Sequence, residues 1–352
     1  MIDIKYVAFD VHKATTSVAV LNLDGRLVTQ AVIRTEASAI RDFLRGISGS
    51  VHLTFEEGTQ SQWLYDLARP LVSQLLVCNA KHCSSVSNKS DKLDSLRLAQ
   101  YLRAGLLKAV YHGSAPTGAL KQMAHIYDSI TADTTRCMNR IKSLYTSRGI
   151  PCSGRDIYYS RNRQQWLGKL DEEGHLLRAE FLYKQLDHLR PLQRDAKKAM
   201  LKEAKRHPAF KKLQQVPGLG PIRVAQIIAA VGSPHRFRTK RQFWTYCGLA
   251  VVTRSSADYE VAEEGLRRKS QSTQTRGLNR EYNRRMKRVF KSGALEALKD
   301  ESVKRIYGRL TSKGMRSEMA LLTVARKISA VALAMWKSGE EFDEKKLTKQ
   351  AA

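Results

Sequence analysis

Cysteine is scarce in this 352-residue sequence, and basic residues outnumber acidic ones almost two to one. The five cysteines include no C-x-x-C pair, so neither a disulfide framework nor a zinc site is predicted. No apolar run approaches the roughly 20 residues that span a bilayer. Met1 is followed by Ile2 and Asp3, not by a basic and then an apolar segment. No signal peptide is therefore predicted, and the cytoplasm of a prokaryote is the expected location.

The shortage of acids leaves 61 Lys and Arg against 33 Asp and Glu, a formal net charge of +28. Such an excess attracts polyanions, and contacts with phosphates release counterions from nucleic acid. Nucleic acid is therefore the expected partner. An anionic membrane is the alternative, but no strongly basic amphipathic anchor stands out and we expect no membrane partner. With 42% apolar residues, the chain can bury the cores of two or three domains.

Residues 1–110 alternate apolar β-type runs with amphipathic helical stretches, in the order βββαβαβα. Strands are predicted at 4–9, 16–23, 27–33, 51–55 and 75–78, and helices at 37–47, 62–72 and 91–104. An antiparallel meander followed by α/β units is typical of a ribonuclease-H-like fold of the resolvase type. We therefore expect an α/β nuclease domain in this region.

The rest of the chain is predicted to be all-α. Residues 111–207 are basic and helical throughout, and Leu182, Leu186 and Leu189 recur at helical spacing. These leucines suit either packing within the chain or a coiled coil between two copies. Residues 208–340 form a third, mostly helical region that ends in a long helix near 318–336. The polar tail, residues 341–352, is expected to fray.

Four acidic residues stand where this fold would bring them together. Asp10 and Glu56 end the first and fourth strands, which lie side by side in a ribonuclease-H-like sheet. A carboxylate ending an apolar strand is costly unless it is paired or binds a cation. Asp91 and Asp94 are three residues apart at the start of the last helix, so they share one face. Mg²⁺ prefers carboxylate oxygens, and paired ions stabilise both oxygens of a phosphoryl displacement, so two Mg²⁺ ions are expected.

Each acid also has a simpler interpretation. Asp91 and Asp94 could merely favour the positive end of a helix. Glu57 could be a surface neighbour of Glu56 or the ligand in its place. His12 is more typical of a supporting or surface group than of a metal ligand.

A glycine-rich turn in the third region resembles a helix-hairpin-helix. It reads Val-Pro-Gly-Leu-Gly at 216–220 and lies between two helical patterns. Gly218 and Gly220 permit a tight turn whose N–H groups can meet a nucleic-acid phosphate. An ordinary turn between packed helices is the alternative.

Residues 266–291 hold ten basic residues against a single acid, Glu281, with Tyr282 and Phe290 interleaved. This composition suits phosphate contacts and base stacking, although a solvated face would look the same. The basic residues are Arg267, Arg268, Lys269, Arg276, Arg280, Arg284, Arg285, Lys287, Arg288 and Lys291.

Several motifs together resemble one known family, the DEDD transposases of bacterial insertion sequences, a group described as bridge-RNA-guided recombinases. Residues 9–13, 55–59 and 88–95 resemble its three acidic motifs, and this alignment favours Glu56 over Glu57. Residues 216–220, 243–249 and 324–342 are similar to its second conserved domain. The resemblance implies a transposase that cuts and rejoins donor and target DNA, with a structured guide RNA and assembly as a dimer or tetramer.

The family resemblance also implies a serine nucleophile, within a Ser-Lys-x-Gly-Asn pattern, and here the sequence departs from the family. An ungapped alignment on Asn283 places Asn279, which is no nucleophile, at the serine. A gap of one helical turn instead places Thr275 there, before Arg276, with Ser272 and Ser270 upstream. We expect Thr275 first, then Ser272, then Ser270. A junction-resolving endonuclease that hydrolyses DNA, or a non-catalytic nucleic-acid-binding scaffold, would each explain part of the same pattern.

Overall fold

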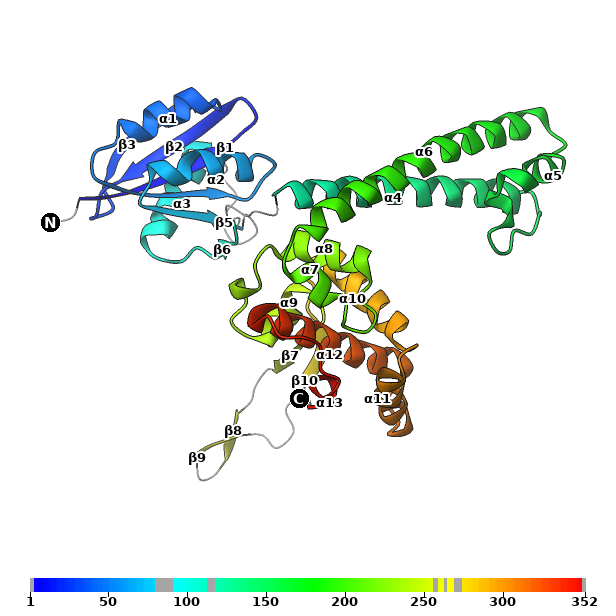
Figure 1. Cartoon of the computed structure of the whole chain (residues 1–352). Coiled ribbons are helices and arrows are strands. Elements are labelled where there is room, and N and C mark those ends of the chain that lie inside the picture. The colour runs from blue at the N-terminus through cyan, green and yellow to red at the C-terminus, as the bar shows by residue number, and fades with distance from the viewer. Residues whose placement is uncertain are drawn as a thin grey trace. The chain divides into compact units, whose positions relative to one another are not determined.

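The computed structural model describes residues 3–79, 91–112, 118–255, 259–262, 265–268 and 274–349 (Figure 1). Only the backbone is described for residues 91–92 and 348–349, and for the described residues between 253 and 276. The chain divides into two compact units, residues 1–114 and 115–352. The regions on either side of residue 207 thus belong to one unit.

The first unit is built on a six-stranded sheet in the order β3-β2-β1-β4-β5-β6. The first three strands form an antiparallel meander, β4 pairs parallel with β1, and β5 pairs parallel with β4. The predicted order of elements up to residue 103 is confirmed. A sixth strand, pairing antiparallel with β5, was not predicted because two residues show no periodicity. The strands are β1 (Ile4–Val11), β2 (Thr15–Leu21), β3 (Leu27–Arg34), β4 (Ser50–Glu56), β5 (Gln74–Cys78) and β6 (Ala109–Val110).

Helices cover both faces of this sheet (Figure 1). On one face, α1 (Ala37–Arg45) and α2 (Ser61–Ala68) pack on alternate strand residues such as Phe9 and Phe55. On the other face, α3 (Asp91–Arg103) packs Leu98 and Ala99 on the residues between them, including Ala8. Side chains alternate along a strand, so each strand serves both cores.

The second unit begins with a long helical hairpin made of α4 (Gly118–Thr146) and α6 (Glu173–Lys205) (Figure 1). Two 3-10 turns, at 156–158 and 160–162, and the short α5 (Arg163–Leu167) lie between them. Leu186 is buried in the hairpin core, and Leu182 and Leu189 pack against it. These leucines therefore pack within the chain, as one of the two interpretations expects.

The remaining helices surround a second core. Its central helix is α12 (Ser317–Ser338). By length and composition alone α12 could cross a membrane, and it is the one such helix among the described residues. Its most apolar stretch is 61% buried inside the protein. The helices are α7 (Ala209–Leu213), α8 (Pro221–Val231), α9 (Lys240–Tyr246), α10 (Arg284–Ala297), α11 (Glu301–Ser312), α12 (Ser317–Ser338) and α13 (Lys345–Lys349). A 3-10 turn at 234–236 precedes α9.

Two expectations for this region were wrong. The polar tail does not simply fray, because α13 forms within it, Leu347 is only 1% exposed, and the carbonyl of Leu347 accepts a hydrogen bond from Lys327 Nζ at 2.8 Å. The region is mostly helical, as predicted, but it is not all-α. Strand β7 (Val251–Ser255) pairs with β10 (Gln274–Leu278), and β8 (Tyr259–Ala262) pairs with β9 (Gly265–Arg268), all antiparallel. Three consecutive β-branched residues at 251–253 favour the first of these strands.

The glycine-rich turn joins α7 to α8 and packs against α10. Gly218 has φ +78°, and a Cβ there would overlap the carbonyl oxygen of Gly293 and lie 2.9 Å from Cβ of Ala297. Arg223 fixes the same contact by donating from Nη1 to the carbonyl oxygen of Gly218 and from Nε to Oγ of Ser292. Gly218 is therefore required by packing, whatever else the turn does.

We predict that Gly218→Ala destabilises the protein by about 2–4 kcal/mol, since it adds both backbone strain and a steric clash. Gly220→Ala is the matched control. Gly220 has φ −69°, and apart from its chain neighbours no described residue lies within 4 Å of its ideal Cβ position, so the cost should stay below about 1 kcal/mol. Urea unfolding followed by circular dichroism measures both variants. Equal stabilities for the two would contradict the close packing of the turn on α10.

Candidate active site and nucleic-acid interface

Strand alternation places Asp10 and Glu56 on the same face of the sheet. Phe9 of β1 pairs with Phe55 of β4, and both side chains enter the core beneath α1 and α2. The next residue on each strand therefore lies on the opposite face, the face that α3 covers. Because β1 and β4 run parallel, the two carboxylates reach the same end of the sheet.

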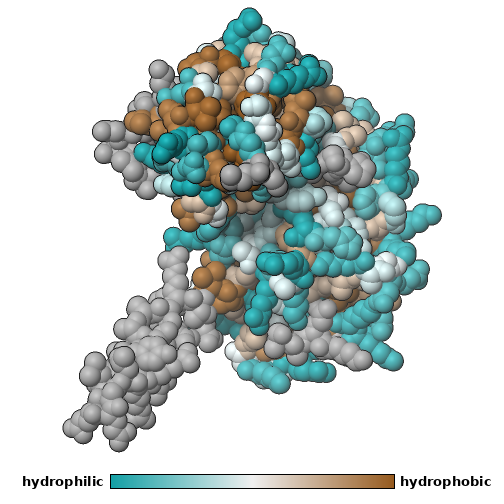
Figure 2. All heavy atoms as spheres, turned by 90° about the vertical axis from the view of Figure 1, so that its left-hand side faces the viewer, coloured by the Kyte–Doolittle hydropathy of each residue, from teal (hydrophilic) through white to brown (hydrophobic). Residues whose placement is uncertain are grey.

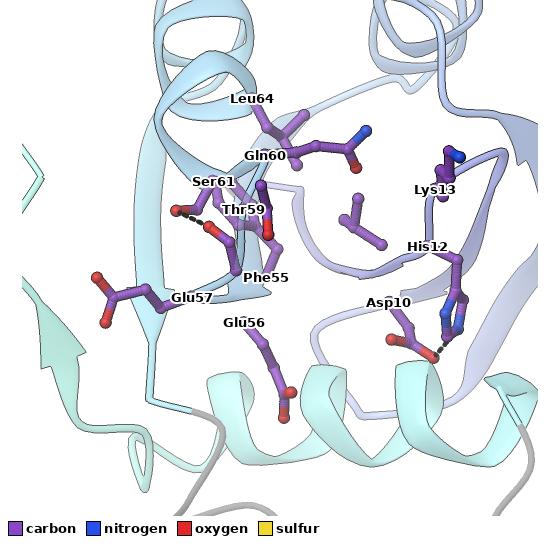
Figure 3. A pocket seen from close by; sticks show the side chains of 12 residues that line it. Asp10, His12, Lys13, Phe55, Glu56, Glu57, Thr59, Gln60, Ser61 and Leu64 are labelled. Atoms are coloured by element: carbon purple, nitrogen blue, oxygen red, sulfur yellow. Dashed lines mark hydrogen bonds and ion pairs between the residues drawn. The ribbon is translucent and has the colours of Figure 1, made fainter. Parts of the chain in front are cut away.

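The side chains of Asp10 and Glu56 both point toward α3, the cyan helix in Figure 3. They line a pocket of about 490 Å³ that also includes His12, Lys13 and Gln60. The side chain of Glu57 points away from them (Figure 3). This geometry favours Glu56 over Glu57 as the partner of Asp10.

His12 supports Asp10 directly. Its Nε2 lies 3.2 Å from Oδ2 of Asp10, within hydrogen-bonding distance. Half of the His12 side chain is exposed, whereas that of Asp10 is largely buried. Such a contact fixes the orientation of the carboxylate, which is the supporting role expected for His12.

Glu57 has a separate environment that the sequence did not reveal. Its Oε1 lies 4.0 Å from Nε2 of His112, whose side chain is 7% exposed. The His112 ring also approaches Oε1 of Gln62 at 3.3 Å and stacks on Tyr65. His112 follows the two-residue strand β6, and no sequence pattern connects that strand to the edge of β5.

The two remaining acids lie on α3. Asp94 has its Oδ1 3.6 Å from Nη1 of Arg97. Asp91 begins the helix, one turn before the buried Ser95 that faces the sheet, and its side chain lies outside the described residues. Among the side chains that the structure describes, no three His, Cys, Asp or Glu residues are close enough to hold a metal ion together.

The chemistry of the pocket nevertheless fits a hard divalent cation. Asp10 and Glu56 offer carboxylate oxygens, the ligands that Mg²⁺ prefers, and no described cysteine lines the pocket. On the α3 side of β4, the hydroxyl of Thr54 is fully buried and has no hydrogen-bond partner among the residues that the structure describes. Thr54 precedes Glu56 by two residues, so this unsatisfied oxygen belongs to the same face as the acids.

The strand pairs β7–β10 and β8–β9 hold one predicted nucleophile, Thr275, and the basic residues Arg267, Arg268 and Arg276. Thr275 lies on β10 opposite Arg254 of β7, and Arg276 follows it. Arg267 and Arg268 end β9. Lys269, Ser270 and Ser272 lie outside the described residues.

The basic residues of α10 divide into two groups. Arg285 and Arg288 face Asp128 of α4, with Nε of Arg285 2.5 Å from Oδ2 and Nη2 of Arg288 3.5 Å from Oδ1. The half-exposed Lys287 lies over the ring of Tyr282, and Arg284 is exposed, as is the preceding Arg280. The electrostatic role of Asp128, an acid 157 positions before Arg285, has no signature in the sequence. On the side of the molecule drawn in Figure 2, hydrophilic residues (teal) cover much of the surface.

The order of the strands in the sheet, with two acids at the ends of its central parallel strands, is the one expected of a ribonuclease-H-like domain. Comparison with known proteins agrees. A model for transposases of the DEDD IS110 type matches residues 7–147, and a model for transposases of the IS116/IS110/IS902 family matches residues 210–308. The chain belongs to the IS110 family of transposases.

Two curated relatives match this chain over only part of its length. The chain is 23% identical over 180 residues to the transposase for insertion sequence element IS1111A of Coxiella burnetii, covering 50% of this chain and 49% of that protein. It is 29% identical over 139 residues to an uncharacterized 43.6 kDa protein of insertion element IS110 of Streptomyces coelicolor, covering 40% of this chain and 31% of that protein. The matches thus span half or less of either relative.

We predict that Arg285→Ala lowers the free energy of unfolding by about 1–3 kcal/mol, because it leaves the largely buried Asp128 without its closest cation. The neighbouring Arg284→Ala removes an exposed cation and should change stability by less than about 0.5 kcal/mol. Thermal and urea unfolding of the two variants give the comparison. Equal free energies of unfolding for the two variants would show that Asp128 does not need the Arg285 cation of α10.

Proposed function

We propose that this protein is a DNA transposase that cuts and rejoins DNA at a site formed by Asp10, Glu56, Asp91 and Asp94. The observation that supports this proposal best is the pairing of β1 with β4, which brings Asp10 and Glu56 to one pocket with both side chains directed toward α3. Asp91 and Asp94 begin the helix that covers this side. Membership of the IS110 family supplies the reaction class.

Two Mg²⁺ ions are the proposed cofactors, with the four acids as their ligands. When bound, such ions polarise the scissile phosphate and stabilise the attacking and leaving oxygens. The protein's own groups prepare the site. His12 orients the Asp10 carboxylate, and the ammonium group of Lys13, which lines the same pocket, offers a positive charge to a DNA phosphate.

A hydroxyl of the second unit is the proposed nucleophile, with Thr275 ranked before Ser272 and Ser270. Its oxygen would form a new bond to phosphorus while the bond from phosphorus to one deoxyribose oxygen breaks. The hydroxyl proton leaves with a base, and the departing oxygen takes up a proton. One phosphodiester replaces another, so the energy needed for rejoining is conserved.

The DNA backbone is proposed to contact the turn between α7 and α8, acting as a helix-hairpin-helix, and the basic residues from Arg267 to Arg288. Gly220 leaves the N-terminus of α8 open, since no other residue crowds the position of an ideal Cβ. Arg284 is the most accessible cation of α10 for this role, whereas Arg285 is already paired with Asp128. A structured guide RNA is proposed as a second ligand on family resemblance alone.

We also propose assembly as a dimer or tetramer through the helical hairpin. Three large apolar side chains of α6 are exposed on one side of that helix: Leu177 at 51%, Phe181 at 60% and Leu192 at 53%. Their spacing of 4 and 11 residues keeps them on one stripe. A coiled coil with a second copy would bury this stripe.

Asp10→Asn and Glu56→Gln should each reduce DNA cleavage by about 100-fold or more, because they remove a ligand rather than an outer contact. The same variants should lose Mn²⁺ binding in calorimetry while retaining DNA affinity. Glu57→Gln is the matched control, since its side chain points away from Asp10 and Glu56. Unchanged cleavage by Asp10→Asn would show that cutting does not depend on this carboxylate and would remove the proposed site.

A covalent link between protein and DNA separates transposition by a hydroxyl nucleophile from simple hydrolysis. Denaturing gels of a cleavage reaction should show protein attached to a labelled DNA strand, and Thr275→Ala should abolish the attached species. Ser272→Ala and Ser270→Ala test the alternatives in the same gel. Cleaved DNA without attached protein would instead indicate a junction-type endonuclease that uses water.

A further inference from the structure

A second cavity, of about 650 Å³, lies within the helical unit and is separate from the acidic pocket. Its walls come from α4, α6, α8 and α10. We propose that this cleft binds a single unpaired nucleotide of the nucleic acid that the protein holds. This inference rests on the proposed function and names the form of nucleic acid that the helical unit recognises.

The size and lining of the cleft suit a base. Pockets for small organic ligands commonly measure about 300–1,000 Å³ and combine apolar walls with a few polar groups. Here the apolar wall includes Tyr127, Leu201 and Ile222, and the polar groups include the hydroxyls of Thr131 and Thr135. The Thr135 hydroxyl donates to the carbonyl of Thr131, so its oxygen can still accept, and the Thr131 hydroxyl accepts from Gln193, so its proton can still be donated. An aromatic ring beside apolar side chains accepts any base by stacking, whereas hydroxyls contact its edges.

The charge of the cleft suits the phosphate of the same nucleotide. Lys197, Arg223 and Arg288 line it. Among its described lining residues the one acid is Asp128. This carboxylate pairs with Arg285 through Oδ2, and its Oδ1 lies 3.5 Å from Nη2 of Arg288 and 2.6 Å from Nε2 of Gln226. The cleft thus carries an excess of positive charge. The first turn of α8, which starts at Pro221 in the same wall, adds the partial positive charge of a helix N-terminus.

The ligand should be unpaired because the cleft is a concave space between four helices. A base within a duplex has its edge and both faces covered, so only an extruded or looped-out base presents the surfaces that this lining complements. Unpaired positions occur in structured RNA and in distorted DNA. Both present the same base and phosphate chemistry, and the experiment must therefore distinguish them.

Two pairs of variants isolate the cleft. Thr135→Trp fills it from the surface of α4, and Ala132→Trp adds the same bulk at an exposed position of that helix outside the lining. Lys197→Ala removes a lining cation from α6, and Lys198→Ala removes the exposed neighbouring lysine, which does not line the cleft. Circular dichroism and thermal unfolding identify any variant that fails to fold.

The probes are 20-base-pair duplexes with and without a single bulged 2-aminopurine, each made as DNA and as RNA. The full-length protein should bind the bulged probe about tenfold more tightly than the perfect duplex, with quenched 2-aminopurine fluorescence, because base stacking adds to backbone binding. Thr135→Trp should abolish both the preference and the quenching without changing affinity for the perfect duplex. Lys197→Ala should weaken the preference severalfold, and both controls should match the wild type.

The outcomes distinguish a failure of the nucleotide site from a failure of the proposed function. Equal affinity of the wild type for bulged and perfect duplexes, or a preference that survives Thr135→Trp, overturns the nucleotide site and leaves the proposed function intact. Binding of no probe overturns both. A preference seen only with RNA, or only with DNA, and lost in Thr135→Trp supports the site and identifies which nucleic acid supplies the nucleotide.

Discussion

The parallel pairing of β1 with β4 is the constraint on which the first unit depends. Phe9 and Phe55 are register partners that anchor both strands in one core, and this fixes the face on which the next residues emerge. A slip of one residue in either strand would turn its acid into the apolar core. The same hydrogen-bonded ladder therefore determines both the stability of the sheet and the composition of the acidic pocket.

The second unit depends on close contact between backbones instead. Gly218 meets Gly293 without a side chain between them, and Arg223 bridges the turn to Ser292. Asp128 adds an electrostatic contact by pairing with Arg285 of α10 and accepting from Gln226 of α8. Three helices are thereby held around one cleft. Part of the basic character of α10 thus serves the fold, and only the remaining cations are candidates for the proposed contacts with nucleic acid.

Local patterns predicted most of the first unit, because strand alternation and helix spacing are properties of neighbouring residues. The same patterns placed Asp10 and Glu56 at adjacent strand ends. They left Glu57 as an alternative to Glu56, because only the structure shows that the Glu57 side chain points away from Asp10. His112 and Asp128 were missed because their contacts join residues 50 to 157 positions apart. The buried Leu347 was missed because a single apolar residue in a polar tail has no periodicity.

The division into two units matters for how such a reaction is controlled. The acids belong to residues 1–114, whereas the proposed hydroxyl belongs to residues 115–352. Neither unit alone holds both halves of the proposed chemistry. If the proposed function holds, DNA that meets only one unit stays intact, and strand breakage depends on bringing both halves to one phosphate. A division of this kind would restrict cutting to the assembled complex.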